Sequence, residues 1–404
     1  MKVWKLKNNI RVLFKRTRTA QVVCMDVFTP VSVSTQNVAN AGIANLTANV
    51  MSKATLTRPA KKLACDIENI GVSLLPSMYY DYAYLEASFL PEYFDKAAEI
   101  FADIIINPAF NKDDIEIERN NVLALLSSQK DSISTTARSN FLKHFYGDNP
   151  YSNPIVGTKE SILAIDDEQI RQWHKKAFNS QNLIFSIAGN IDENKAYEIV
   201  EKHFGQIESG QKFQKPVFKQ SVNGGKEVFV TSKFNQGFIF MGYEADNLYS
   251  KHFEAGKVVA EILGGRMTSR LFVELREKLG LAYDVGASYP ARVWQSYFGI
   301  YIGLDKKNIE MTLKRIDKIV KNFCSKQMSD QELNGAKNYM RGVYSFSRQT
   351  VADLAYVYGA NEILGFGWKY EDQYLDRLST IKAIDVYKAA NLIFEKKPTT
   401  VVLR

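Results

Sequence analysis

The sequence predicts an α+β fold of two homologous domains, in which each domain is a mainly antiparallel sheet with helices packed on one face. Three features indicate this fold: an internal repeat, long helical stretches that no strand directly follows, and a polar segment between the repeats. Strands and helices that are segregated along a chain favour an antiparallel or mixed sheet over a doubly wound parallel one. The length of 404 residues also exceeds what one hydrophobic core usually supports.

The first repeated segment runs from an alternating strand through a turn into an amphipathic helix. Residues 84–110 read YLEASFLPEYFDKAAEIFADIIINPAF, and residues 297–323 read YFGIYIGLDKKNIEMTLKRIDKIVKNF. In both segments the apolar pattern changes from the period of a strand to the period of a helix at matching places. The pattern therefore predicts the same strand, turn and helix in both halves.

Two further pairs of segments repeat in the same order. The stretches 117–147 and 333–365 are long and helical, whereas 164–189 and 383–404 are each a helix followed by a terminal strand. We therefore interpret the chain as a tandem duplication of one α+β unit.

A polar segment separates the two halves. Residues 205–227 (GQIESGQKFQKPVFKQSVNGGKE) are rich in Gly, Lys, Gln and Ser, which is typical of a linker. The sequence thus predicts an N-terminal domain over residues 1–204 and a C-terminal domain over residues 228–404.

The composition is that of a globular protein, with 46% hydrophobic and 24% charged residues. The formal charge of +8 permits an acidic partner, but no RNP-like or zinc-finger pattern occurs, so we predict no nucleic-acid binding. No apolar run reaches the length of a membrane span. The N-terminal MKVWKLKNNIRVLFKRT lacks the apolar centre of a signal peptide. We expect a cytoplasmic protein, or a periplasmic one if a leader has been removed.

Cysteine and histidine bear on redox and metal chemistry. The cysteines cannot all pair, and their apolar or helical contexts predict buried free thiols: Cys24, Cys65 and Cys324. The histidines never stand four residues apart, so no zinc-binding helix is predicted from them: His144, His174, His203 and His252.

The stretch AGIANLTANVMSKAT, residues 41–55, is rich in small residues and predicts a helix. It places Asn45 and Asn49 four residues apart on one face, with Ala48 just before the second. On the residues alone, these are ordinary polar positions on an amphipathic helix. The apolar residues of its other face are Ile43, Leu46 and Val50.

Several stretches spread over the chain carry a resemblance to one family. They read GIANLTANVMSKATLTRP, LPEYFDKAAEIFADIIINPAF with the trailing IEIERNNVL, YSNPIVGTKESI, and TSRLFVELREKLGLAYDV. Together with the duplicated halves, they resemble the pitrilysin and mitochondrial-processing-peptidase family of zinc peptidases along essentially the whole chain. The resemblance implies a processing-peptidase-like fold of two α+β domains.

In catalytic members of that family, the first stretch carries the zinc motif H-x-x-E-H, and a Glu about 80 residues further on supplies the third ligand. The corresponding positions here are Asn45, Ala48, Asn49 and, seven residues after Glu118, Leu125. Asparagine is a poor zinc ligand, alanine cannot accept a proton, and leucine offers the metal nothing. The resemblance therefore implies a former zinc site, no metal or cofactor in this chain, and zinc in a partner subunit.

The second half retains a pair that the family uses to hold peptide. LREKLGLAY places Arg276 and Tyr283 seven residues apart, with Gly280 in the turn between them. The resemblance implies that both side chains contact the bound peptide near the scissile bond. A guanidinium can donate two hydrogen bonds to a peptide carbonyl or carboxylate, and a phenol can donate one to the oxyanion as it forms. On the residues alone, the pattern fits a second interpretation just as well, in which Arg276 is a solvated residue on a basic helix that also carries Arg270 and Lys278.

The leading hypothesis from the sequence is a non-catalytic subunit of a heterodimeric zinc peptidase, most similar to bacterial members of the family. Its partner would be a homologous chain that carries H-x-x-E-H, and peptides would be the substrates. Only Gly264 and Gly265 precede the helix of Arg276, so the long glycine-rich loop of the mitochondrial subunit is absent. Two alternatives stay open: an inactive scaffold or peptide-binding protein of the same fold, and an autonomous peptidase with a relocated metal site.

Overall fold

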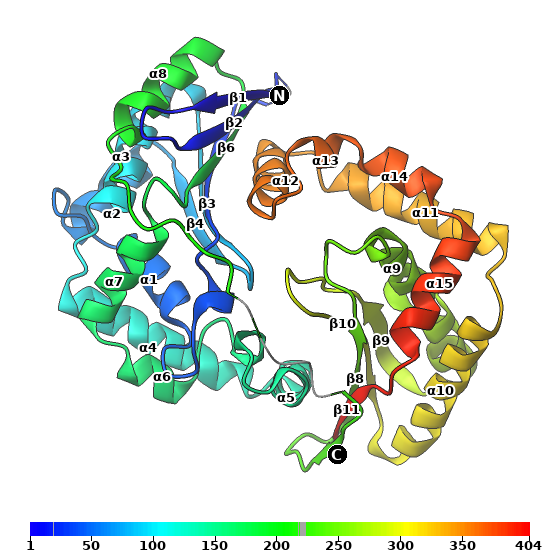
Figure 1. The fold of residues 1–404 in the computed structure, drawn as a ribbon. Coiled ribbons are helices and arrows are strands. Elements are labelled where there is room, and N and C mark those ends of the chain that lie inside the picture. Colours follow the sequence, from blue (N-terminus) through cyan, green and yellow to red (C-terminus); the bar gives the residue numbers. More distant parts are fainter. Residues whose placement is uncertain (19, 217, 219–223) are drawn as a thin grey trace. The chain divides into compact units, whose positions relative to one another are not determined.

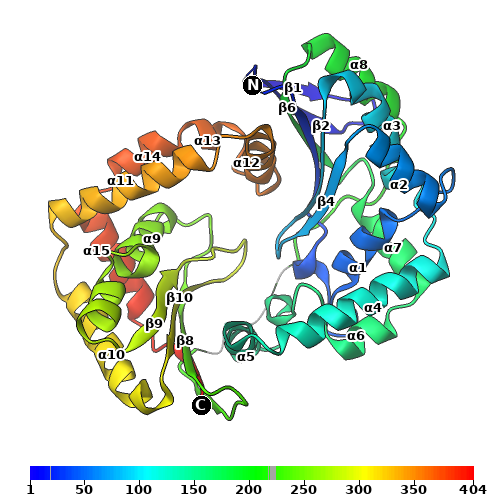
Figure 2. The same ribbon diagram turned by 180° about the vertical axis from the view of Figure 1, so that it is seen from behind.

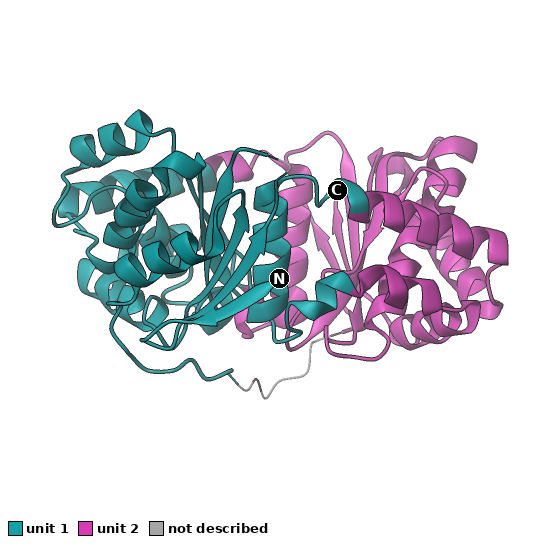
Figure 3. Ribbon diagram, turned by 90° about the horizontal axis from the view of Figure 1, so that it is seen from above, with its two compact units in different colours: residues 1–126, 153–217, 345–372 teal, residues 127–152, 218–344, 373–404 magenta. Residues whose placement is uncertain are grey.

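The computed structural model describes residues 1–18, 20–216, 218 and 224–404, which form two compact units (Figures 1 and 3). Unit 1 comprises residues 1–126, 153–217 and 345–372, and unit 2 comprises residues 127–152, 218–344 and 373–404. The predicted linker, 205–227, lies partly outside the described residues. Its described part contains no helix, and a strand begins only at its last residue, Glu227.

The sheet of unit 1 has six strands in the order β1-β2-β6-β3-β5-β4. Every neighbouring pair is antiparallel except β2 and β6, which are parallel. The sheet is thus mainly antiparallel, as the sequence predicts. Its strands are β1 (Lys2–Lys5), β2 (Arg11–Arg16), β3 (Val23–Thr29), β4 (Ser73–Met78), β5 (Ala83–Phe89) and β6 (Ile184–Gly189).

Helices cover one face of this sheet and enclose the main core of unit 1. Val23, Met25 and Val27 of β3 point into that core. Figure 1 and the reverse view in Figure 2 place α2, α3 and α8 on this side of the strands. The helices of unit 1 are α1 (Ile43–Met51), α2 (Ala60–Asn69), α3 (Phe94–Ile106), α4 (Lys112–Gln129, which ends beyond the unit), α6 (Lys159–Ala164), α7 (Asp167–Ala177), α8 (Glu193–Phe204), α12 (Val351–Ile363) and α13 (Lys369–Asp372), with short 3-10 turns at Val33–Thr35 and Pro91–Tyr93.

The opposite face of the sheet in unit 1 is covered by α12, a helix from the second half of the chain. Cys24 and Ala188 pack against Val351 and Ala355 of this helix. Phe28 lies in a second apolar group with residues of the same helix. Both faces of β3 are therefore buried, and all seven of its residues are inaccessible to solvent.

Unit 2 is built in the same way around a five-stranded sheet of order β7-β11-β8-β10-β9. Only β7 and β11 are parallel. Its strands are β7 (Glu227–Val230), β8 (Gly237–Ala245), β9 (Ala282–Ser288), β10 (Ser296–Leu304) and β11 (Thr399–Leu403). Its helices are α5 (Ile133–Tyr146), α9 (Phe253–Ala260), α10 (Ile309–Ser325), α11 (Asp330–Phe346, which ends beyond the unit), α14 (Tyr374–Thr380) and α15 (Ala383–Phe394), with π-helical turns η4 (Glu261–Gly265) and η5 (Phe272–Lys278) and 3-10 turns at Pro150–Ser152 and Lys306–Asn308.

The repeat observed in the sequence is present in the fold. The strand, turn and helix of residues 83–106 recur at residues 296–325. The helices α5 and α12 occupy equivalent places in the two repeats, yet each belongs to the unit of the other repeat. In unit 2, Phe141 of α5 stacks on Phe240 of β8 with ring centroids 4.6 Å apart. Each repeat therefore contributes a segment to the unit of the other repeat, and α12 and α5 in these segments cover the second face of the two sheets.

Candidate functional site

The first part of the candidate site is helix α1, whose start is fixed by side chains from two other segments. The N–H of Gly42 donates to Gln36 Oε1 at 2.7 Å. Ser161 Oγ donates to the carbonyl of Ala41 at 2.7 Å. These bonds satisfy backbone groups where α1 begins and tie the helix to the N-terminal turn of α6.

The structure places the three residues that the resemblance aligns with the zinc motif on two different faces of α1. Asn45 and Asn49 are half-buried and share one face, as their spacing predicts. Ala48 is 1% exposed and belongs to the apolar core. The exposed side of the helix therefore offers two neutral amides and neither an imidazole nor a carboxylate, so these residues do not fit a zinc ion.

The fourth position lies on α4, which is held in place by a buried pair of charged residues. Glu118 accepts from Lys53 Nζ at 2.8 Å, and this ion pair joins α4 to the turn after α1. Arg119 donates to the carbonyls of Ile162 and Ile165, the latter at 2.9 Å, at the end of α6. Leu125, two turns further along α4, is 44% exposed. The ion pair and hydrogen bonds that hold α4 are present, but the residue expected at the third ligand position carries an alkyl side chain.

Histidine does not replace these ligands. His174 is half-buried, its Nε2 lies 2.8 Å from the carbonyl oxygen of Ile105, and desolvation of the ring lowers its pKa to about 4. Among the described residues, the only group of three or more His, Cys, Asp or Glu side chains close enough to share a metal ion is Cys24, Asp26 and Glu86. Sequence analysis missed Asp26 and Glu86, which are 60 residues apart and meet only through strand pairing.

The cysteines are free, but they are not all buried. Cys24 is buried, Cys324 is half-buried and Cys65 is exposed. The prediction of a buried thiol was wrong for Cys65 because α2 buries only Leu63 fully and leaves most of its surface to solvent.

The second part of the candidate site begins in the π-helical turn η5, which carries Arg276. This side chain is exposed, and its guanidinium lies 4.9 Å from the ring centroid of Phe272 one turn earlier. Arg270 makes a two-pronged ion pair with Glu332, with both N···O distances at 2.8 Å, whereas Arg276 has no carboxylate partner in the described part of the chain. Arg276 is therefore available to an outside carbonyl or carboxylate.

Tyr283 follows η5 on strand β9. Gly280 adopts φ of 59° and lets the chain turn, while the N–H of Leu281 donates to the carbonyl of Leu275 at 2.8 Å. Tyr283 is 44% exposed. Burial and the neighbouring Asp284 raise the pKa of Tyr283, so its hydroxyl is protonated and able to donate at neutral pH.

The turn after η5 brings Arg276 and Tyr283 to the same end of β9. One hydrogen bond, from Leu281 to Leu275, closes the turn that joins the two positions. Both side chains reach solvent, and both carry donors of the kind that bind peptide carbonyls and carboxylates. Their exposure also fits the simpler interpretation, in which Arg276 is a solvated residue of a basic helix and Tyr283 is a partly exposed aromatic residue of a strand.

Two family models, both of peptidase family M16, match the chain. The family model described as "Insulinase (Peptidase family M16)" matches residues 11–159, and the one described as "Peptidase M16 inactive domain" matches residues 164–340. An uncharacterized zinc protease of Rickettsia bellii is 27% identical over 403 residues, which cover 99% of this chain and 97% of that protein.

Two solved structures share the fold. A protease from Helicobacter pylori superposes with a TM-score of 0.92 at 20% identity, over 100% of this chain and 99% of that chain. A peptidase M16 inactive domain from Pseudomonas fluorescens superposes with a TM-score of 0.90 at 21% identity, over 100% of this chain and 97% of that chain.

Within the described residues, no helix combines the length and the apolar composition that a membrane span requires.

Proposed function

The chain belongs to the insulinase family of peptidases (peptidase M16), and we propose that it is the non-catalytic subunit of a heterodimeric zinc peptidase. Its partner is a homologous chain that carries H-x-x-E-H and supplies the zinc-bound water and the general base. This chain completes the peptidase chamber and holds the peptide substrate. The observation that carries the proposal is the contrast between a zinc site without ligands and an exposed Arg276 and Tyr283.

The lost ligands support a role without metal chemistry at the motif positions. Asn45 and Asn49 lie where zinc ligands stand in catalytic members, and Leu125 lies where the third ligand stands. Ala48 is buried in the core, so no general base is left beside them. A single change of this kind can be compensated by a neighbour, but four changes remove the ligands and the base together.

The retained pair supports a role in holding peptide. A guanidinium without an acidic partner binds a peptide carbonyl or a terminal carboxylate through two parallel hydrogen bonds. A protonated phenol donates to the oxygen that gains charge when a peptide bond is attacked. Arg276 and Tyr283 thus supply substrate contacts that a partner with its own zinc and base requires for turnover.

Co-expression with the H-x-x-E-H paralogue from the same genome tests the proposal. The chain alone is expected to cleave no quenched peptide, whereas the purified complex cleaves it. Arg276→Ala in this chain should lower kcat/KM of the complex at least about tenfold, the equivalent of one charged hydrogen bond. Lys278→Ala is the matched control, because Lys278 is exposed on the same turn and, among the described residues, pairs only with Glu274, at 3.3 Å.

The alternative of an inactive scaffold or peptide-binding protein predicts a different result. A complex that forms normally but whose turnover is unchanged by Arg276→Ala and by Tyr283→Phe would support that alternative. Peptide cleavage by the purified chain alone would contradict both and favour an autonomous peptidase.

A further inference from the structure

A second group of metal-type side chains lies on the sheet of unit 1, away from the motif positions on α1. Cys24 and Asp26 stand two residues apart on β3 and are both 0% exposed. Glu86 is the register partner of Asp26 on the neighbouring strand β5 and is half-buried. The Cys24 sulfur and one oxygen of each carboxylate lie within 4.8 Å of one another.

The buried carboxylate of Asp26 is only partly satisfied. Its Oδ1 accepts from Cys24 Sγ at 3.4 Å, but among the described residues its Oδ2 has no hydrogen-bond partner. Beside Cys24, the helix α12 contributes Val351 and Ala355, whose side chains carry no donor. Burying a carboxylate oxygen without a hydrogen-bond partner costs free energy of folding. A bound cation or a proton on the carboxyl group would remove this cost.

The surrounding charges favour a cation. Asp26 and Glu86 place two carboxyl groups beside the Cys24 thiol, and within the described residues neither carboxyl group forms an ion pair with a Lys or Arg.

We propose that Cys24, Asp26 and Glu86 bind a divalent cation of the zinc type, through the Cys24 sulfur and one oxygen of each carboxylate. Zinc takes one thiolate and two carboxylates readily, because it is borderline in softness and accepts four ligands. Three protein ligands leave one position for water. This site lies outside the degenerate motif and departs from the sequence expectation of a chain without metal.

The geometry requires only a small convergence of side chains. A tetrahedral zinc site with bonds of about 2.0–2.3 Å holds its ligand atoms about 3.3–3.8 Å apart. Glu86 is half-buried and can rotate toward the strand pair, and Ser88 Oγ donates to its Oε1 at 3.2 Å. Binding of the cation displaces the thiol proton and any proton on the Asp26 carboxyl, both of which pass to solvent, and it frees Asp26 Oδ1 from its bond with Cys24.

The proposed site goes beyond the peptidase role and does not depend on it. It joins β3 to β5 beneath α12, which makes it a structural site that stabilises the sheet of unit 1. Failure of metal binding here would leave the expected peptide turnover of the complex unchanged, because Arg276 and Tyr283 belong to unit 2.

Cobalt titration of the metal-free full chain tests the site, since a cobalt–thiolate bond gives a strong near-ultraviolet charge-transfer absorption. We expect one Co²⁺ per chain with that absorption, and its displacement by Zn²⁺. Cys24→Ser should abolish the absorption. Glu86→Gln removes a ligand, so it should lower the affinity for cobalt by more than the roughly 10–100-fold that is typical when only a residue hydrogen-bonded to a ligand is changed. Cys65→Ser is the matched control, because Cys65 is exposed and free.

Two outcomes would overturn the site. One is the absence of the absorption in the folded wild-type chain. The other is an absorption that survives in Cys24→Ser and disappears in Cys65→Ser. Circular dichroism checks folding, and the half-buried Glu86→Gln gives an independent readout if Cys24→Ser does not fold.

Discussion

The ring of Tyr283 in β9 occupies the space directly over Gly303 in β10, where any β-carbon would overlap the ring. The backbone of Gly303 pairs with Asp284, the residue after Tyr283. The position of the Tyr283 hydroxyl is therefore set by the neighbouring strand as well as by its own.

This relationship predicts that Tyr283→Phe and Gly303→Ala impair the same step. Tyr283→Phe removes the donor and should lower kcat of the complex roughly 10²-fold, as loss of an oxyanion donor does. Gly303→Ala displaces the ring and should lower kcat in the same direction while the two chains still assemble. Steady-state kinetics with Tyr339→Phe, a change at another exposed tyrosine of unit 2, provides the control. Unaltered kcat in Tyr283→Phe would refute a role for this hydroxyl.

The exchanged helix α5 is predicted to depend on a fit between Phe141 and Gly242. A β-carbon at Gly242 of β8 would overlap the ring of Phe141. Gly242→Ala should therefore lower the free energy of unfolding by about 1–3 kcal/mol through overpacking. Phe141→Ala should lower it by about 3–5 kcal/mol. In denaturant titrations, the double variant should lose less than the sum of the two, and strict additivity would show that the residues do not compete for space.

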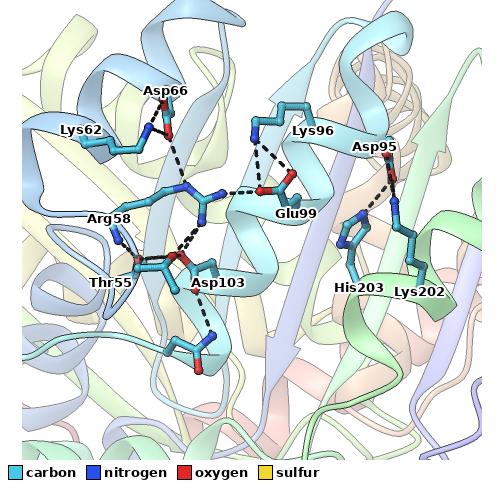
Figure 4. Close-up of polar contacts among 12 residues, drawn as sticks. Thr55, Arg58, Lys62, Asp66, Asp95, Lys96, Glu99, Asp103, Lys202 and His203 are labelled. Carbon is cyan, nitrogen blue, oxygen red and sulfur yellow. Dashed lines mark hydrogen bonds and ion pairs between the residues drawn. The ribbon is translucent and has the colours of Figure 1, made fainter.

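The buried Arg58 is predicted to be the main polar contributor to the stability of the α2–α3 region. Figure 4 shows its guanidinium among Asp66, Glu99 and Asp103, with Nη1 2.5 Å from Asp103 Oδ2. Arg58→Ala leaves Asp103 buried without its cation, so the free energy of unfolding should fall by about 3–5 kcal/mol. Lys62→Ala, which removes only an exposed ion pair to Asp66, should change it by less than about 1 kcal/mol.

The same cluster predicts a loss of stability in acid. Burial raises the pKa of Asp103, but hydrogen bonds from Thr55, Thr57, Asn107 and Arg58 outweigh it, so the pKa lies below its usual value. The stabilisation from Asp103 is therefore complete above the unfolded pKa of about 3.9 and is lost as the pH falls through the folded pKa. Unfolding measured between about pH 6 and pH 2 should show a weaker acid dependence in Asp103→Asn than in wild type. Equal acid dependence in the two proteins would contradict this assignment.

The apolar periodicity of the sequence was sufficient to predict the repeated strands and helices and their order along the chain. The strand, turn and helix of residues 84–110 and 297–323 are local patterns, and both are present in the structure. The exchange of α5 and α12 was not predictable, because a local pattern states which element forms but not which sheet it covers.

The candidate sites were less predictable, because the sequence does not show which charged residues form ion pairs or which residues face one another on neighbouring strands. Arg270 and Arg276 look alike in the sequence, and only the approach of Glu332 to Arg270 separates a structural arginine from an available one. Asp26 stands inside a strand that is buried on both faces, and its neighbour Glu86 is identified only by the pairing of β3 with β5.

The rate of peptide cleavage by an equimolar mixture of this chain and its H-x-x-E-H partner, relative to the partner alone, tests the proposed function most directly. We predict a mixture at least about tenfold faster, with most of the gain lost when this chain carries Arg276→Ala. A mixture no faster than the partner alone, although the two chains co-purify, would contradict the proposed function.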